Sequence, residues 1–184
     1  GVNLENFPVT FPSPATNGVS VFDYDNNRIY RYFVACDDKK IYAYDKDGKM
    51  MPGWAFEGTK SEVTTPIRHF RIKGKDYIVF KDEYQIYIQN RKGEAVAKTA
   101  AEFENSRNPL ILSLGSKPKI IATDTKGTIY YIDFDGNFTE KEVGKFDDDR
   151  FFRADDLNGD NVFEYIFIDG KELTVMDENG TVLF

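Results

Sequence analysis

The stretch IYAYDKDG, residues 41–48, decides the fold because a variant of it recurs three times along the chain. The other copies are IYIQNRKG at 86–93, IYYIDFDG at 129–136 and LTVMDENG at 173–180. All four have an aliphatic residue at the first position, Asp or Asn at the fifth and Gly at the eighth, and the four glycines are spaced by 45, 43 and 44 residues. A repeat of this period indicates an array of similar supersecondary units.

Each copy has the chemistry of a β-strand that runs into a tight turn. The Asp or Asn caps a type I turn by accepting a hydrogen bond from the backbone two residues on, and the Gly adopts the left-handed conformation that lets the next strand begin. Apolar segments precede every copy, at 30–36, 76–81, 118–123 and 164–168. Another apolar segment precedes each of these, and a fourth strand is expected after each glycine. Both faces of the strands are apolar or aromatic, so each sheet needs a cover on both sides.

Four-stranded antiparallel sheets of about 44 residues, each stacked between neighbours, predict an all-β protein with the fold of a four-bladed β-propeller. We expect a single domain over residues 1–184, with blades at about 17–60, 61–107, 108–149 and 150–184. The segment 5–11 is in register with the outer strands, so it is expected to complete the last blade and close the ring. The alternatives are four consecutive blades of a larger propeller, or half of an eight-bladed dimer. A closed monomer is favoured because open blade edges expose unpaired strands and apolar faces.

The blades resemble those of the quinoprotein-type and WD-repeat-type β-propellers, and the resemblance covers essentially the whole chain. The stretch AYDKDGKMMPGW, residues 43–54, is similar to the quinoprotein blade motif A-x-D-x-x-T-G-x-x-x-W. It departs from the motif because Gly48 comes one residue early and Trp54 lies two residues too far from that glycine. The resemblance therefore does not carry over the quinone cofactor or the dehydrogenase activity, and no quinone cofactor is expected. The chain also resembles C-terminal propeller-like regions of large uncharacterised bacterial proteins, which implies no activity.

The stretch DLNGDNVFEY, residues 156–165, resembles the calcium loops of FG-GAP and VCBS repeats, whose pattern is D-x-[DN]-x-D-x-x-x-[DE]. The resemblance implies that calcium is bound by the side chains of Asp156, Asn158, Asp160 and Glu164 and by the backbone carbonyl of Val162. Calcium takes about six to eight oxygen ligands, which alternate residues of a tight loop can supply. An EF-hand is excluded because Asn161 and Phe167 occupy the places where that loop requires Gly and Glu.

The same stretch also has the chemistry of a turn without a metal, because Asn-Gly is a strong hairpin signal and the flanking Asp and Asn side chains can cap it. Residues 23–34, DYDNNRIYRYFV, align with residues 156–167 without a gap, and Arg31 stands where the fourth blade has Glu164. A cation at that position can neutralise the nearby aspartates, which predicts a turn without metal in the first blade. For the fourth blade both interpretations, calcium site and plain turn, remain open.

Other candidate residues have structural explanations. His69, the one histidine, lies on an apolar strand and is predicted to pack within its blade, and Trp54 is expected to pack as well. Cys36, the one cysteine, ends an apolar strand and is predicted to be an inert buried thiol. The run FDDDR, residues 146–150, is expected to be a solvated acidic loop.

Charge and hydropathy exclude further classes. The net charge of -7 and the pI of about 4.8 disfavour nucleic acid and anionic membranes as partners, whereas a cation or a basic protein would be attracted. No apolar run is long enough to span a membrane, so direct membrane insertion is not expected.

These observations favour a non-catalytic propeller module, a scaffold or interaction domain of a larger bacterial protein outside the cytoplasm, stiffened by calcium if the loop of the fourth blade binds it. The alternative is a propeller enzyme that acts on carbohydrate or a related substrate through carboxylates at one mouth of the ring. The enzyme is the less favoured class because a fold alone implies no activity. The protein or small-ligand partner is not specified by the sequence.

Overall fold

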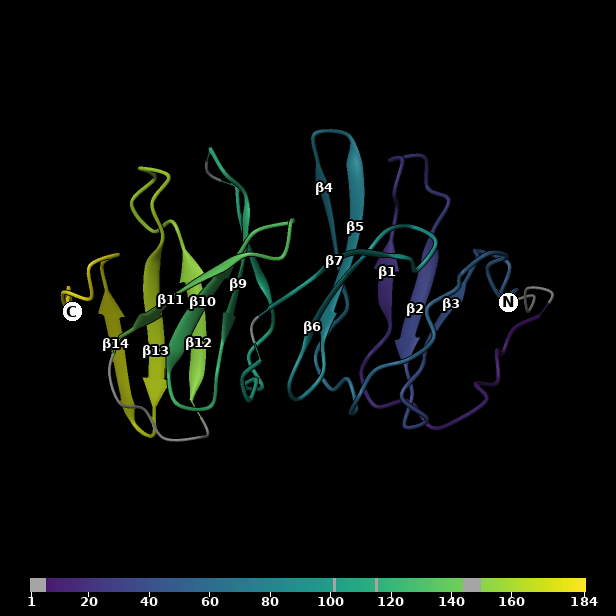
Figure 1. Ribbon diagram of the computed structural model, residues 1–184, viewed down its shortest axis with the longest axis horizontal. Helices are drawn as coiled ribbons and strands as arrows, with labels where there is room; N and C mark the ends of the chain where they lie inside the picture. Colours follow the sequence, from purple (N-terminus) through teal and green to yellow (C-terminus); the bar gives the residue numbers. More distant parts are fainter. Residues whose placement is uncertain (1–5, 101, 115, 144–149) are drawn as a thin grey trace. The chain divides into compact units, whose positions relative to one another are not determined.

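A computed structural model describes residues 6–100, 102–114, 116–143 and 150–184 (Figure 1). Within these ranges the regular elements are β-strands, which form four antiparallel sheets. The chain divides into two compact units, Gly1–Lys98 and Thr99–Phe184, and each unit contains two of the sheets. The expected all-β architecture of four small antiparallel sheets is therefore confirmed.

The first unit contains the first two sheets, which we call blades one and two. Blade one has the order β1-β2-β3, formed by β1 (Ser20–Phe22), β2 (Arg31–Ala35) and β3 (Ile41–Tyr44). Blade two has the order β4-β5-β6-β7, formed by β4 (Arg68–Ile72), β5 (Lys75–Lys81), β6 (Ile86–Gln89) and β7 (Ala95–Lys98). Each sheet is a meander, so strands that are neighbours in the chain are neighbours in the sheet.

The second unit repeats this arrangement in blades three and four. Blade three contains β8 (Ile111–Ser113), β9 (Lys119–Thr123), β10 (Thr128–Ile132) and β11 (Phe138–Glu142). Blade four contains β12 (Phe151–Asp155), β13 (Glu164–Asp169) and β14 (Glu172–Met176). Consecutive strands pair in chain order in both sheets.

The repeated turn has the predicted geometry in all four blades. In blade one, Asp45 Oδ1 accepts hydrogen bonds from the backbone N–H groups of Asp47 and Lys49, each at 2.9 Å. Asn90, Asp133 and Asp177 accept the equivalent pairs of bonds in the other blades. The glycine that follows each of them has a positive φ, of 77°, 77°, 91° and 83° in chain order. The capping side chain and the left-handed glycine therefore account for the turn.

Blades one and four have three strands each, and a single bridge stands where the fourth strand was expected. These isolated bridges join Tyr44 to Met50 and Met176 to Val182. In blade one the segment after the bridge contains Pro52 and Gly53, the latter with a φ of 80°. Proline has no N–H for the ladder and a left-handed glycine turns the chain, so the pairing stops there.

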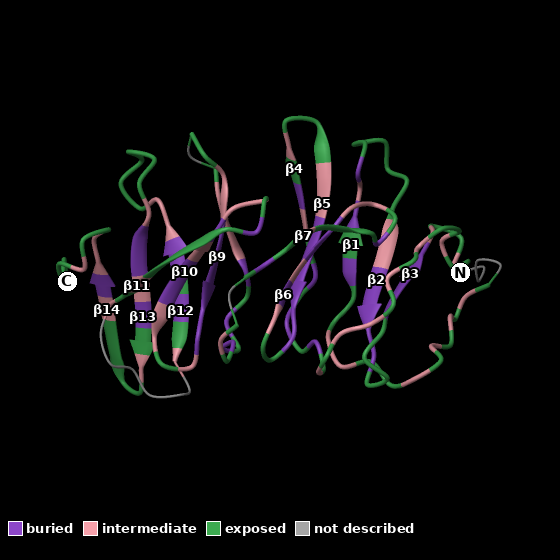
Figure 2. Cartoon of the chain, viewed as in Figure 1, coloured by how far each residue is buried: buried purple, intermediate pink, exposed green. Residues whose placement is uncertain are grey.

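Each unit has a core between its two sheets (Figure 2). In the first unit, Phe33 from blade one and Phe80 from blade two are both fully buried in the same cluster. Trp54 packs against this cluster with its ring edge-on to Phe33 and donates its indole N–H to the Ile41 carbonyl at 2.7 Å. In the second unit, Ile129 of blade three packs with the blade-four residues Phe152, Ala154, Tyr165 and Phe167. The aromatic residues of the repeats are thus used for packing between blades.

The N-terminal segment packs on blade one. The segment that follows blade one, which contains Trp54 and Phe56, packs on blade two in the same way. Val9 and Phe11 contact the apolar face of blade one that includes Val34 and Tyr44. A Cβ added to Gly48 would meet Val9 and Phe7 at 3.0 and 3.1 Å. A Cβ added to Gly93 would meet the segment that contains Trp54 and Phe56 in the same way. Residues 7–11 therefore pack on blade one as Trp54 and Phe56 pack on blade two, and the completion of the fourth blade by segment 5–11 stays a prediction.

Candidate functional site

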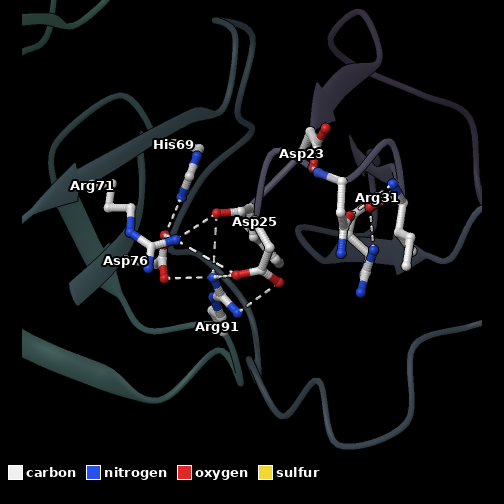
Figure 3. A network of polar contacts seen from close by, with 10 residues as sticks. Asp23, Asp25, Arg31, His69, Arg71, Asp76 and Arg91 are labelled. Atoms are coloured by element: carbon white, nitrogen blue, oxygen red, sulfur yellow. Dashed lines mark hydrogen bonds and ion pairs between the residues drawn. The ribbon is translucent and has the colours of Figure 1, made fainter. Parts of the chain in front are cut away.

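A polar network joins the loop after β1 to blade two (Figure 3). Arg91, in the turn after β6, places its Nη2 atom 2.8 Å from Asp25 Oδ1 and 2.7 Å from Asp76 Oδ2. Arg71 on β4 donates to the Tyr24 carbonyl at 2.6 Å, and its Nη1 atom lies 3.5 Å from Asp25 Oδ1. The network thus holds a loop of one blade on the strands of the next.

His69 belongs to the same network. Its Nε2 atom lies 2.7 Å from Asp76 Oδ1, and the Asp76 side chain is only 7% exposed. The β4–β5 register pairs Arg71 with Asp76, so His69 and Asp76 are diagonal neighbours on one face of the sheet. The sequence predicted a histidine packed within its blade, and the structure adds its acidic partner. Only the strand register identifies that partner.

Aromatic rings cover the charged groups of this network. The Arg91 guanidinium lies over the Tyr24 ring, with Cζ 4.5 Å from the ring centroid, and the His69 ring centroid lies 4.9 Å from that of Tyr24. The hydrogen bond from Arg91 lowers the pKa of the Asp25 carboxyl, and burial raises the pKa of the Tyr24 phenol. The carboxylates of Asp25 and Asp76 are therefore each paired with a cation. The network holds blade one and blade two together, and we call it the inter-blade clamp.

The predicted calcium loop of blade four lies between β12 and β13. Asp156 Oδ1 accepts hydrogen bonds from the backbone N–H groups of Gly159 and Asp160 at 2.7 and 3.1 Å, and its Oδ2 accepts one from Asn161 at 2.9 Å. Asp160 Oδ1 accepts a bond from the Val162 N–H at 2.8 Å. Both aspartates are thus turned toward the amides of their own loop.

Glu164 closes the loop from the first residue of β13. Its side chain is buried, with the residue 5% exposed. Its Oε2 atom accepts the Leu157 N–H at 2.8 Å, and its Oε1 atom accepts the Asn158 side-chain amide at 3.0 Å. The structure therefore brings Glu164 to Asn158, but these two partners of the buried carboxylate are both neutral.

The aligned loop of blade one has a similar backbone conformation. Asp23 accepts hydrogen bonds from the N–H groups of Asn27 and Arg28, which are the counterparts of Asp160 and Asn161. The third and fifth residues after the leading aspartate are left-handed in both loops, with φ of 52° and 64° in blade one and 81° and 68° in blade four. The gapless alignment of the two stretches therefore reflects a shared turn. Arg31, in the place of Glu164, donates to the Ile29 carbonyl of this loop.

Within the described ranges, no three His, Cys, Asp or Glu side chains are grouped so that they could hold a metal ion. Ion binding at the blade-four loop would therefore require Asp156 and Asp160 to turn from the loop amides toward a common centre with Glu164. The donor set of three carboxylates and one amide nevertheless suits a hard cation such as calcium.

A tyrosine–aspartate pair recurs in the first three blades. The tyrosine after the aliphatic residue of the repeat donates to the aspartate of the preceding turn: Tyr42 to Asp38, Tyr87 to Asp82 and Tyr130 to Asp124, at 2.6, 2.8 and 3.3 Å. The bond to Asp38 raises the pKa of Tyr42 to about 12. Burial, with the Asp124 carboxylate, raises the pKa of Tyr130 to about 12. These acids therefore stabilise turns.

Two further reactive groups are enclosed by the first unit. Cys36 is 1% exposed, and burial raises the pKa of its thiol, as expected for an inert cysteine. Lys81, at the end of β5, is 2% exposed, and burial lowers its pKa to about 7. The sequence offered no signal for this buried lysine beyond its position 45 residues after Cys36, which is the repeat spacing of the first two blades. Residues 146–149 of the acidic run lie outside the described residues.

Comparison with solved structures shows the fold. BamB from Moraxella catarrhalis is similar with a TM-score of 0.63 and 16% identity, over 94% of this chain and 53% of that one. The WD40 domain of Neurospora crassa Pan2 has a TM-score of 0.59 and 12% identity, over 94% and 49%. The V. cholerae biofilm matrix protein Bap1 has a TM-score of 0.58 and 14% identity, over 91% and 28%.

These likenesses establish that the four sheets are blades of the β-propeller type, as the repeat predicted. The chain spans about half the length of the BamB chain, at 53%. No family model matches the sequence, and no curated protein matches it. A helix long and apolar enough to cross a membrane is not found in the described part of the chain.

Proposed function

We propose that this chain is a non-catalytic interaction module, a scaffold that forms part of a larger bacterial protein. One observation carries the proposal: acidic side chains in several loops bind the protein's own backbone or its own cations. Asp45 caps a turn, Asp23 orders the loop of blade one, and Asp25 is paired with Arg91. Acids that are used in this way stiffen a surface, which suits a rigid docking platform. The likeness to a WD40 domain supports the same class by analogy of fold.

A location outside the cytoplasm is part of this proposal. One similar structure is a biofilm matrix protein, which supports this location by analogy. The single cysteine is compatible with a reducing and with an oxidising compartment.

The module is tested by a photo-crosslinking residue in place of Val96, which is 45% exposed on β7. In cells of the source organism we expect a discrete protein adduct that an excess of unlabelled chain suppresses. The alternative is an enzyme that acts on carbohydrate. Turnover of a glycoside panel that acid-to-amide variants abolish, with no competed adduct at Val96 or at the exposed Leu173, would establish the enzyme instead.

A structural calcium ion at Asp156, Asn158, Asp160, Val162 and Glu164 is the second proposal. The environment of Glu164 favours calcium binding. Its buried carboxylate has two neutral hydrogen-bond partners, which offset its negative charge less well than a nearby cation would. If calcium binds, its role is to stiffen the corner between β12 and β13.

Millimolar calcium is expected to raise the melting temperature relative to chelator, since a ligand that binds only the folded state stabilises it by mass action. At a hundredfold excess over the dissociation constant the stabilisation is about 2.7 kcal/mol. Asp160→Ala is expected to remove the calcium dependence, whereas Asn27→Ala at the equivalent position of blade one is expected to retain it. Equal melting temperatures of the unsubstituted chain in about 5 mM calcium and in chelator would eliminate the ion and leave a plain turn.

A further inference from the structure

Three Asn-Gly pairs occur in the chain, at 17–18, 158–159 and 179–180. In such a pair the backbone nitrogen of the glycine can attack the side-chain carbonyl carbon of the asparagine, because glycine has no side chain in the way of the approach. Ammonia leaves, a cyclic imide forms, and water opens it to aspartate or isoaspartate. Whether a given pair reacts depends on how the fold holds the two reacting groups.

The pair in the loop of blade four is held with both groups in place. Asn158 Oδ1 accepts the backbone N–H of Asp160 at 2.9 Å, which turns the Asn158 side chain along its own loop. The Gly159 N–H donates to Asp156 Oδ1 at 2.7 Å. Asn158 and Gly159 are exposed, and a Cβ added to Gly159 would have nothing within 4 Å of it. The approach of the reacting groups and of water is therefore unobstructed.

Both contacts favour the attack on the amide. The Asp156 carboxylate is bonded to the hydrogen that the Gly159 nitrogen must lose, which is the position of a general base. The Asp160 N–H is bonded to the oxygen that becomes negative when the nitrogen adds to the carbonyl, which is the position of an oxyanion donor. The same N–H lies 3.1 Å from Asp156 Oδ1, so it holds the base and the carbonyl together.

The other two Asn-Gly pairs lack this combination. The Gly180 N–H donates to the backbone carbonyl of Asp177 at 3.0 Å, and a neutral carbonyl is a much weaker base than a carboxylate. The Asn17 side chain is bonded to other segments, since its Oδ1 accepts the Ala35 N–H at 2.8 Å and its Nδ2 donates to the Thr65 carbonyl at 3.2 Å. The fold therefore distinguishes the pair in blade four.

We propose that Asn158 is a self-deamidation site of the folded protein. The Gly159 nitrogen forms a bond to Asn158 Cγ, and its proton passes to Asp156 and from there to the leaving nitrogen. The bond between Cγ and Nδ2 breaks, and ammonia departs. Water then adds to either carbonyl carbon of the imide, which gives aspartate or isoaspartate. One water is consumed and one ammonia is released, and nothing is oxidised or reduced.

The reaction removes a partner of a buried acid. Asn158 Nδ2 donates to Glu164 Oε1 at 3.0 Å, and Glu164 is 5% exposed. A carboxylate in place of this amide has no hydrogen to donate and carries the same charge as Glu164. Deamidation therefore loosens the corner between β12 and β13. The loop itself sets the rate of this change, which requires neither a partner nor calcium.

Asn158 and Asn179 can be followed in one digest, because trypsin places them in separate peptides, 154–171 and 172–184. The folded chain is incubated in chelator at neutral pH, and mass spectrometry with fragmentation measures the loss of each asparagine over time. We expect Asn158 to react about tenfold faster than Asn179. In the urea-unfolded chain the two rates should be similar, since both asparagines precede glycine.

Asp156→Asn keeps an oxygen acceptor for the loop amides but is a far weaker base, so it is expected to slow the loss of Asn158 about tenfold. Asp160→Asn is the matched control, because the Asp160 side chain accepts the Val162 N–H, whereas the Gly159 N–H donates to Asp156. This control should leave the rate unchanged. Thermal unfolding verifies that both variants are folded.

Equal rates for Asn158 and Asn179 in the folded chain, or an undiminished rate in a folded Asp156→Asn variant, overturn the self-deamidation site. Asn158→Asp reproduces the aspartyl product and is expected to lower the melting temperature in chelator by about 5 °C. An unchanged melting temperature would contradict the loosening of the corner. Chelator is present throughout, so these outcomes do not depend on whether the loop binds calcium.

Discussion

Replacing Gly93 by alanine is expected to destabilise the first unit by about 3 kcal/mol. Gly93 has a φ of 77°, which is unfavourable for any residue with a Cβ. A Cβ at this position would also lie 2.8 Å from the Phe56 backbone N and 3.1 Å from Cε3 of Trp54. The inter-blade segment would have to move away from the turn, so the strain and the steric clash add.

Gly74→Ala is the matched control, because Gly74 has a φ of 78° and an added Cβ would have nothing within 4 Å of it. It should cost about 1 kcal/mol, from backbone strain alone. Urea unfolding followed by tryptophan fluorescence measures both, since Trp54 is the single tryptophan and belongs to the first unit. Equal losses for the two variants would mean that the inter-blade segment does not press on Gly93.

Replacing Arg91 by methionine is expected to cost about 2 kcal/mol, which lies between the losses for exposed and for buried ion pairs, because Arg91 is 36% exposed whereas its partner Asp76 is 7% exposed. Asp76 is 7% exposed and would keep His69 and the longer contact from Arg71, whose Nη1 atom lies 3.9 Å from Asp76 Oδ1. Its Oδ2 atom would lose the 2.7 Å contact with Arg91. The methionine preserves much of the apolar stem, so the loss reports on the charge.

Two further variants identify the cause of this loss. Arg153→Met removes an arginine that is 71% exposed and paired with Asp155, and it should change stability by less than about 0.5 kcal/mol. Asp76→Asn in the Arg91→Met background should recover part of the loss, because the buried negative charge is removed as well. If Arg91→Met is no more destabilising than Arg153→Met in the same unfolding assay, the network does not clamp the two blades.

The repeat unit could be predicted because its chemistry is local. The cap and the glycine of IYAYDKDG lie three residues apart, and their hydrogen bonds close within five residues. The likeness between the loops that begin at Asp23 and Asp156 is local for the same reason, and the structure has the same left-handed positions in both. The shortened outer strands were less predictable. In blade one, Pro52 and Gly53 end the pairing with β3, but this matters only once the folded chain has placed the outer segment beside that strand.

The contacts between blades could not be predicted in this way. Asp25 and Arg91 are 66 residues apart, and His69 meets Asp76 only through the strand register. Tyr87 and Gln89 could be placed on one strand face from the sequence, but the Phe56 ring that stands edge-on to Tyr87 comes from the segment after blade one.

Local propensity and spacing along the chain were thus sufficient for the all-β class, the repeat of about 44 residues and the turn at each Asp or Asn and Gly. The tertiary structure decided which acids are paired with arginines and which lysine is buried. The physical reason is that turns depend on neighbouring residues, whereas burial and ion pairing depend on residues that only folding brings together.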